Sequence, residues 1–279
     1  MSGIVSLVRR RPIISFFALA YGLSWGVGLL VRGEPTGAFS PLFAGGPLVA
    51  AVLIVAMTDG RVGLRDLLNR LLRWQVAPGW YALVIGLPVA IVGSAIGLNT
   101  LFGGTAPDWS KAPGLMQLLL FFTIFLVVPI AAPLGEEVGW RGFALPSLLA
   151  SRSALVATLI LGALWAAWHL PVVLANPSVR PPAPFLLAVP ALAVLVTWLF
   201  LHTRESVFVA LLFHAWYDLV LVFVLAILVP ADSERFLWAV AAVQWLAAAV
   251  VVVSARERWL VAPQAPFAQL RTAPHPSPA

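Results

Sequence analysis

Long apolar runs that contain almost no charged residues dominate this chain. The segment 13–31, for example, has no ionisable side chain apart from one tyrosine, and about 20 such residues cross a bilayer as a helix. The whole chain is 61% hydrophobic and only 10% charged, with a mean hydropathy of +0.98. A soluble domain cannot hide that much apolar surface from water, so the sequence predicts an all-α, polytopic membrane protein.

The apolar runs predict about eight transmembrane helices packed as a bundle around a polar cavity that faces the cytoplasm. Their expected limits are 13–31, 41–57, 80–98, 115–134, 155–175, 185–201, 207–229 and 236–253. The segment 61–74 differs, because its leucines recur at helical spacing while its arginines occupy the other face. This pattern predicts an amphipathic helix in the membrane interface, with the arginines toward lipid headgroups.

Basic residues divide unevenly between the two sides of such a bundle. If the N-terminus is cytoplasmic, 13 of the 17 lysines and arginines fall in cytoplasmic segments and 4 fall outside. The positive-inside rule therefore predicts a protein of the cell membrane, inner or plasma, with both termini in the cytoplasm. The net charge of +6 follows this distribution and does not indicate a nucleic-acid partner.

Ionisable residues between or within the apolar runs are functional candidates, because charge at membrane depth is costly. Glu136, Glu137 and Arg141 follow the fourth run. On a helix, Glu137 and Arg141 are four residues apart and can pair, whereas Glu136 points about 100° away, toward a cavity. For this stretch alone, a cytoplasmic loop with solvated charges remains the alternative.

Three further polar residues lie inside apolar runs, namely His169, His214 and Asp218. A single histidine there is more often packed and hydrogen-bonded than a ligand, but Asp218 needs a partner, and His214 lies four residues earlier on the same face. If their helices converge with Glu136, the four groups could activate a water molecule. Zinc held by Glu136, His169 and His214 and a metal-free water are both compatible with these residues. The absence of cysteine excludes a thiol nucleophile.

The order of these residues on successive apolar helices resembles the CPBP family. This family comprises the type II CAAX prenyl endopeptidases and the related bacteriocin-processing and immunity proteins, and we expect this chain to be a bacterial member. The resemblance covers roughly 115–223 and rests on three motifs, Glu136-Glu137-x-x-x-Arg141, Trp165-x-x-x-His169 and His214-x-x-x-Asp218. Two positions depart from the family pattern: Trp165 stands where Phe is commonest, and Asp218 stands where Asn is usual.

The resemblance implies an eight-helix intramembrane peptidase, a glutamic or metallo-type hydrolase. Glu136 would activate water with help from His169. The oxyanion would be stabilised by His214 and the residue four positions later, while Glu137 and Arg141 would form a supporting pair. An ionised carboxylate cannot donate to an oxyanion. We therefore hypothesise that Asp218 orients His214 and that the protonated imidazole is the donor.

The implied reaction is hydrolysis of a peptide bond near the C-terminus of a membrane-embedded or lipidated substrate. A non-enzymatic immunity or scaffold protein is the main alternative, and a transporter is disfavoured because no internal repeat is visible. We divide the chain into N-terminal helices (1–114), a catalytic core (115–225), a last transmembrane helix (226–255) and a disordered, Pro-rich tail (256–279). For Glu136 to reach the histidines, the fourth helix must continue past Pro133, and nearby glycines permit a bend.

Overall fold

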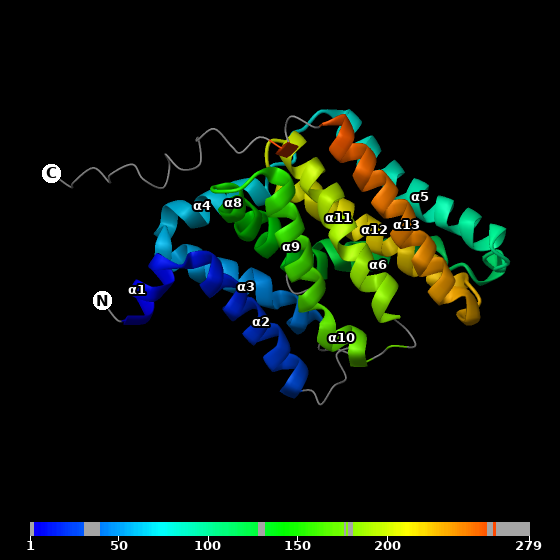
Figure 1. The fold of residues 1–279 in the computed structure, drawn as a ribbon, viewed down its shortest axis with the longest axis horizontal. Helices are drawn as coiled ribbons and strands as arrows, with labels where there is room; N and C mark the ends of the chain where they lie inside the picture. Colours follow the sequence, from blue (N-terminus) through cyan, green and yellow to red (C-terminus); the bar gives the residue numbers. More distant parts are fainter. Residues whose placement is uncertain are drawn as a thin grey trace.

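Every regular element among the residues that the computed structural model describes is helical, as the apolar composition predicted (Figure 1). The structure describes residues 3–30, 40–127, 132–175, 177, 181–255 and 259–260. The α-helices are Gly3–Arg10 (α1), Pro12–Leu30 (α2), Ser40–Thr58 (α3), Gly60–Leu71 (α4), Pro78–Leu101 (α5), Leu115–Val127 (α6), Ala132–Gly139 (α7), Leu145–Leu149 (α8), Ala154–Trp168 (α9), Leu170–Ala175 (α10), Pro182–His202 (α11), Val207–Ile227 (α12) and Ser233–Ser254 (α13). Short helical turns cover Trp109–Lys111 (η1), Trp140–Ala144 (η2) and Pro230–Asp232 (η3).

Five helical segments in the described ranges are long and apolar enough to cross a membrane, which makes this a multi-pass membrane protein. They are Pro78–Leu101, Ala154–Ala175, Pro182–His202, Val207–Ile227 and Pro230–Ser254. The expected number of eight is thus reached only in part. The first two expected spans correspond to the shorter apolar helices Pro12–Gly26 and Phe43–Thr58. The fourth is represented by α6 and α7, and residues 128–131 between them lie outside the described residues, as does nearly all of the tail 256–279.

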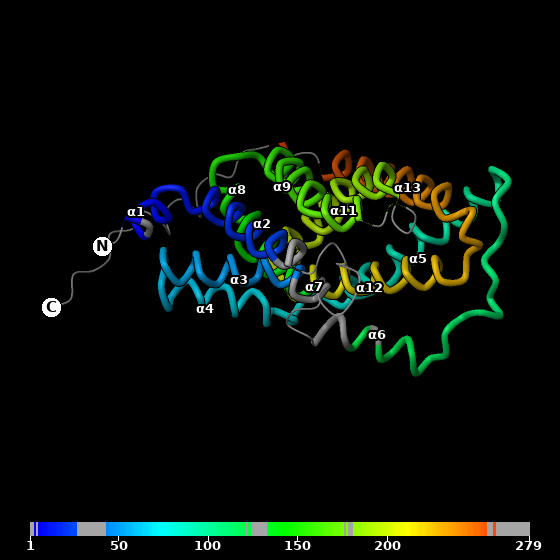
Figure 2. The backbone as a smooth tube through the Cα atoms, turned by 90° about the horizontal axis from the view of Figure 1, so that it is seen from below, coloured from blue at the N-terminus to red at the C-terminus, as the bar shows by residue number. Residues whose placement is uncertain are grey.

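The bundle places helices of the predicted core beside α5 and α13, which lie outside that core. Helix α9 packs on α11, α11 on α13, α13 on α5, and α5 on α12. Helix α6 lies at the edge of the bundle and contacts α12 and α7 (Figure 2). On the other side, α2 packs on α3, and α3 on α7.

Helix α7 approaches α3 so closely that only glycine fits at two contact points. A Cβ atom on Gly135 would lie 2.4 Å from the Ala44 carbonyl oxygen, and one on Gly139 would lie 2.4 Å from Cβ of Pro47. These glycines were predicted to permit a bend, but in the structure they also permit close packing. Helical geometry does continue past Pro133, which suits the first turn of a helix because it lacks an N–H group. The backbone that carries Glu136 is therefore held directly against α3.

A π-helical turn, η2, follows α7 directly. Such turns are rare and often occur at functional sites. Trp140 at its start is fully buried, and its ring packs against those of Phe16, Phe17 and Trp168, with centroids 5.7, 5.9 and 5.8 Å away. This aromatic cluster packs η2 against α2 and α9.

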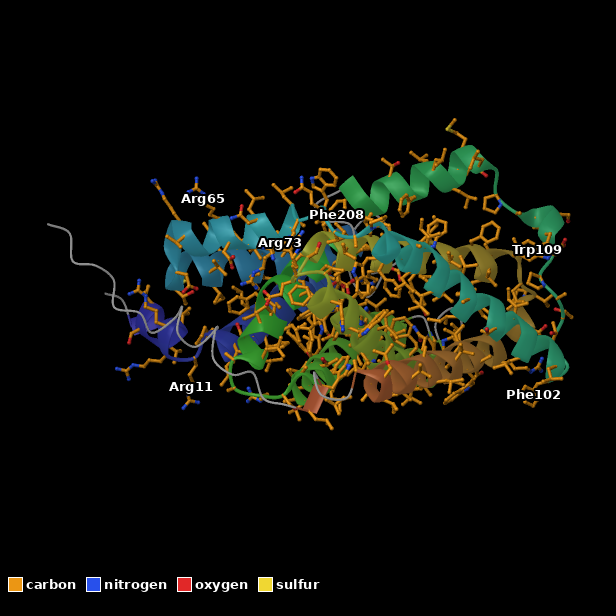
Figure 3. All side chains as sticks on the ribbon, turned by 90° about the horizontal axis from the view of Figure 1, so that it is seen from above. Arg11, Arg65, Arg73, Phe102, Trp109 and Phe208 are labelled. Carbon is orange, nitrogen blue, oxygen red and sulfur yellow. The ribbon has the colours of Figure 1, made fainter. Side chains whose placement is uncertain are left out.

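The predicted interfacial helix 61–74 is present as α4, which ends at Leu71. Leu67 is its buried residue, whereas Leu68 and Leu72 are exposed. Arg65 and Arg11 lie toward one end of the molecule, and Phe102 and Trp109 lie toward the other (Figure 3). That separation agrees with the predicted interfacial role, while the contact with lipid headgroups and the orientation of the termini stay predictions.

The segment after α4 is tied to the loop that precedes α12. Arg70 pairs with Asp66 at 2.7 Å and with Glu205 at 3.5 Å. The Ser206 hydroxyl donates to the Arg73 carbonyl, and its oxygen accepts from Val209 N–H at 3.0 Å as the N-cap of α12. Burial raises the pKa of Glu205, although the neighbouring arginines oppose this shift. The start of α12, and hence its register, is fixed by α4.

Candidate active site

One cavity of about 250 Å³ brings together the four side chains expected to carry chemistry. Glu136, His169, His214 and Asp218 all line it, although they come from α7, the junction of α9 and α10, and α12. We call it the polar cavity. Its remaining walls are mainly apolar and include residues of α3, α11 and α13. Its predicted opening toward the cytoplasm stays a prediction.

Glu136 is buried, with 3% of its surface exposed, and its side chain faces the polar cavity. The indole Nε1–H of Trp165 donates to Glu136 Oε2 across 2.5 Å. A hydrogen bond from a donor to a carboxylate is short and strong when both groups are buried. Trp165 therefore fixes the orientation of the carboxylate and leaves its other oxygen to face the cavity.

Glu137 is fully buried and does not line the polar cavity. Its Oε1 accepts from Arg141 Nη1 at 2.7 Å, which confirms the predicted pairing four residues apart. The same oxygen lies 2.9 Å from His214 Nδ1. The Arg141 guanidinium also lies over the Trp165 ring, with Cζ 4.6 Å from the centroid. Glu137 thus joins α7, η2 and α12 through one oxygen atom.

His214 has a carboxylate oxygen beside each ring nitrogen. Because a carboxylate only accepts hydrogen bonds, Nδ1 must carry the proton that is shared with Glu137. Nε2 lies 3.6 Å from Asp218 Oδ2, which is within ion-pair range but long for a hydrogen bond. The sequence suggested Asp218 as the partner of this histidine, whereas the structure gives the direct hydrogen bond to Glu137.

His169 lies at the break between α9 and α10, where the fifth apolar run turns. Its Nδ1 donates to the Trp165 carbonyl at 2.9 Å, since a carbonyl oxygen can only accept. In the neutral ring, Nε2 is then the basic nitrogen. Trp168 and Phe185 pack edge-on against the imidazole, with centroids 4.8 and 5.1 Å away.

The candidate zinc ligands do not form a metal site in the structure. Among the residues that the structure describes, no group of three or more His, Cys, Asp and Glu side chains is arranged to hold a metal ion. Glu136 Oε2 accepts from Trp165, and Nδ1 of His214 is directed at Glu137. The second oxygen of Glu136 and Nε2 of His169 and His214 remain as the atoms of this set that could hold an ion, and a resident zinc stays a prediction.

Two further polar residues of the polar cavity were missed from sequence. Tyr217 lies beside Asp218 on α12, and Gln244 lies on α13. Gln244 could have been recognised as a candidate from the sequence, because it is the single amide side chain within the apolar run 236–253. Trp165 had been noted as an aromatic residue, but the donation of its indole N–H to Glu136 was not foreseen.

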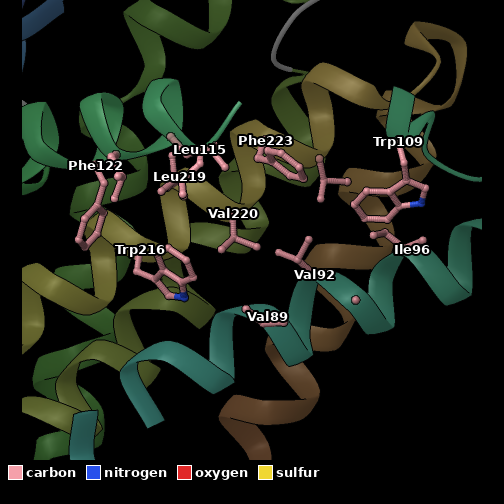
Figure 4. Close-up of a pocket in the computed structure, with 14 residues that line it drawn as sticks. Val89, Val92, Ile96, Trp109, Leu115, Phe122, Trp216, Leu219, Val220 and Phe223 are labelled. Carbon is pink, nitrogen blue, oxygen red and sulfur yellow. The ribbon is translucent and has the colours of Figure 1, made fainter. Parts of the chain in front are cut away.

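A second, larger cavity of about 450 Å³ lies on the other face of α12, between that helix and helices α5 and α6 (Figure 4). We call it the apolar cavity, because its lining contains no ionisable residue. Trp216, Leu219, Val220 and Phe223 form the α12 side of this cavity. It offers no group for acid–base chemistry, so the smaller polar cavity is the candidate active site.

Comparison with known proteins agrees with this assignment. Residues 116–220 match the family model described as type II CAAX prenyl endopeptidase Rce1-like. The CAAX prenyl protease 2 of Methanococcus maripaludis is 26% identical over 178 residues, which are 60% of this chain and 65% of that protein. The match therefore spans just under two thirds of the relative's length, and the expected bacterial origin stays a prediction. The matched segment contains all six residues predicted for the site, and over this segment the chain is similar to the Rce1-like CAAX prenyl endopeptidase family, also called CPBP.

Proposed function

We propose that this protein is an intramembrane peptidase that hydrolyses a peptide bond near the C-terminus of a membrane-associated or lipidated substrate. The observation that carries the proposal is the meeting of Glu136, His169, His214 and Asp218 at one cavity within an apolar helical bundle. Such a cavity can hold water and a peptide segment while lipid stays outside. The name of the methanogen relative supports a prenylated peptide as the first substrate class to test.

In the proposed mechanism, Glu136 is the general base. Its carboxylate, held by Trp165, accepts a proton from a water molecule as the water oxygen bonds to the scissile carbonyl carbon. Nε2 of His169 can accept the second hydrogen of that water and so orient it. Glu136 then returns the proton to the leaving nitrogen, the C–N bond breaks, and the products are a carboxylic acid and an amine.

His214 is the proposed oxyanion donor. In the doubly protonated ring, Nδ1–H donates to Glu137 and Nε2–H can donate to the negatively charged oxygen of the tetrahedral intermediate. A carboxylate oxygen near each nitrogen suits this charged form. The negative charge of Asp218 stabilises the protonated His214 ring, and Glu137 and Arg141 hold the imidazole in place.

The decisive experiment compares Glu136→Gln with Glu234→Gln, a substitution of an exposed carboxylate on α13. Purified protein in lipid nanodiscs would be assayed with quenched fluorescent peptides, with and without a prenylated C-terminal cysteine. We expect Glu136→Gln to lower kcat by at least about 100-fold, the usual contribution of a general base, and Glu234→Gln to change little. Peptide binding without cleavage, unaffected by Glu136→Gln, would instead favour the immunity or scaffold alternative.

A further inference from the structure

Gln244 carries a buried amide group that the proposed mechanism does not use. The residue is 0% exposed and lines the polar cavity from α13, in a helix of otherwise mainly apolar side chains. The Tyr217 hydroxyl is near enough to act as a hydrogen-bond partner of the amide, but neither Nε2 nor Oε1 meets full hydrogen-bond geometry with any described residue. A buried polar group without a well-formed hydrogen bond lowers the stability of the fold by about 1–3 kcal/mol, so an apolar side chain at this position would give a more stable protein.

The chemistry of the amide indicates which ligand could satisfy it. Glu136 and ionised Asp218 can only accept hydrogen bonds, and a protonated His214 only donates. A side-chain amide does both from adjacent atoms, and a peptide group likewise offers one N–H and one C=O. A peptide backbone is therefore a matched partner for Gln244, in a way that a lipid tail is not.

Gln244 lies on a different helix from the groups proposed to act on the scissile bond. Glu136 and His214 belong to α7 and α12, whereas Gln244 belongs to α13 and lies outside the segment 116–220 that the family model matches. A peptide lying in the cavity between these walls would have its reacting carbonyl on one side and a neighbouring peptide group on the other. Positioning a substrate by such a remote contact can raise the rate by holding the reacting atoms together.

We propose that Gln244 is a substrate-positioning residue that hydrogen-bonds one backbone amide of the peptide next to the scissile bond. This inference rests on the proposed peptidase function. It assigns Gln244 the recognition of the peptide backbone rather than of a particular substrate side chain.

The test combines Gln244→Met, which is similar in size, with substrates in which single backbone amides are replaced by esters. We expect Gln244→Met to lower kcat/KM by about 5- to 100-fold, from the loss of a partner for a buried polar group. In the unmodified enzyme, the ester at one position next to the scissile bond should cause a similar loss. In Gln244→Met that same ester should cause no further loss, whereas esters elsewhere should act alike in both proteins.

A structural role would not produce this position-dependent loss. Thr197→Val is the control, because Thr197 is also buried, its hydroxyl has no hydrogen-bond partner in the part of the chain that the structure describes, and it lines neither cavity. This variant should leave every rate within about twofold. Gln244→Leu provides a second variant if Gln244→Met folds poorly. Unchanged kcat/KM in a folded variant, or equal losses at every ester position, would overturn the inference.

Failure of the proposed function can be told apart from failure of this inference. If the unmodified protein cleaves no peptide, the peptidase proposal is wrong, and binding of a labelled peptide to the unmodified and Gln244→Met proteins then decides the role of Gln244. Weaker binding in Gln244→Met, with the same ester dependence, supports the contact. Binding that is equal within twofold contradicts it.

Discussion

The shared oxygen of Glu137 yields the most quantitative prediction. Arg141 and Glu137 are both fully buried and paired at 2.7 Å, and His214 contacts the same oxygen at 2.9 Å. Arg141→Met removes the cation and leaves a buried carboxylate with only the imidazole as partner. Breaking a buried ion pair in this way costs about 3–5 kcal/mol. Nε and Nη2 of Arg141 have no hydrogen-bond partner among the described residues, so removing these buried groups offsets part of that cost, and we expect a net loss of about 3 kcal/mol.

A double-variant cycle tests whether the pair is the cause of the loss. Glu137→Gln should also destabilise the protein, because it leaves the Arg141 charge uncompensated. The combined variant contains neither charge, so its loss should be smaller than the sum of the two single losses by at least about 2 kcal/mol. Unfolding would be followed by far-UV circular dichroism and tryptophan fluorescence during SDS titration of protein in mixed micelles.

An exposed arginine supplies the control for this cycle. Arg152→Met removes an exposed cation that donates a hydrogen bond to the neighbouring Ser151 hydroxyl. This change should alter stability by less than about 0.5 kcal/mol. A loss below about 1 kcal/mol for Arg141→Met, or additivity within about 0.5 kcal/mol, would show that the ion pair does not stabilise this fold.

Three other predictions follow from the same structure. Asp218→Asn should lower kcat/KM about tenfold at neutral pH, because a neutral amide no longer favours the His214 imidazolium, and equal or higher activity would contradict that role. Burial raises the pKa of Glu205, so its contribution to stability, complete below the ordinary carboxyl pKa, is lost as pH rises through the raised value. Glu205→Gln should remove this loss, so its melting temperature relative to the unmodified protein should rise with pH, and a constant difference would refute the argument. Because Glu136 is proposed to activate water directly, dialysis against EDTA should leave activity unchanged, whereas inactivation reversed by zinc would show that the polar cavity takes a metal.

The sequence predicted the local features of this protein better than its distant contacts. The apolar runs predicted an all-helical membrane protein, and the four-residue spacing predicted the pair between Glu137 and Arg141. Both follow from the geometry of a single helix. The first two apolar runs form the 19-residue helices α2 and α3, of which the apolar stretches Pro12–Gly26 and Phe43–Thr58 were found among the described residues.

Contacts between distant segments could not be derived from spacing. His214 and Glu137 are 77 residues apart in sequence, and Trp165 and Glu136 are 29 apart. Asp218 was the nearest candidate partner of His214 along the helix, yet the three-dimensional packing of α7 against α12 provides the closer carboxylate. Gln244 escaped notice for a similar reason, since an uncharged amide in an apolar run has no motif of its own.

Helix α12 separates the two cavities, and none of its side chains lines both. Small apolar molecules that enter the larger cavity would therefore leave the smaller one accessible to peptide. Inhibitors found by their affinity for the larger cavity should lower the maximal velocity without changing the substrate concentration at half-saturation. Compounds that compete with substrate must instead carry polar groups that complement Glu136 and His214.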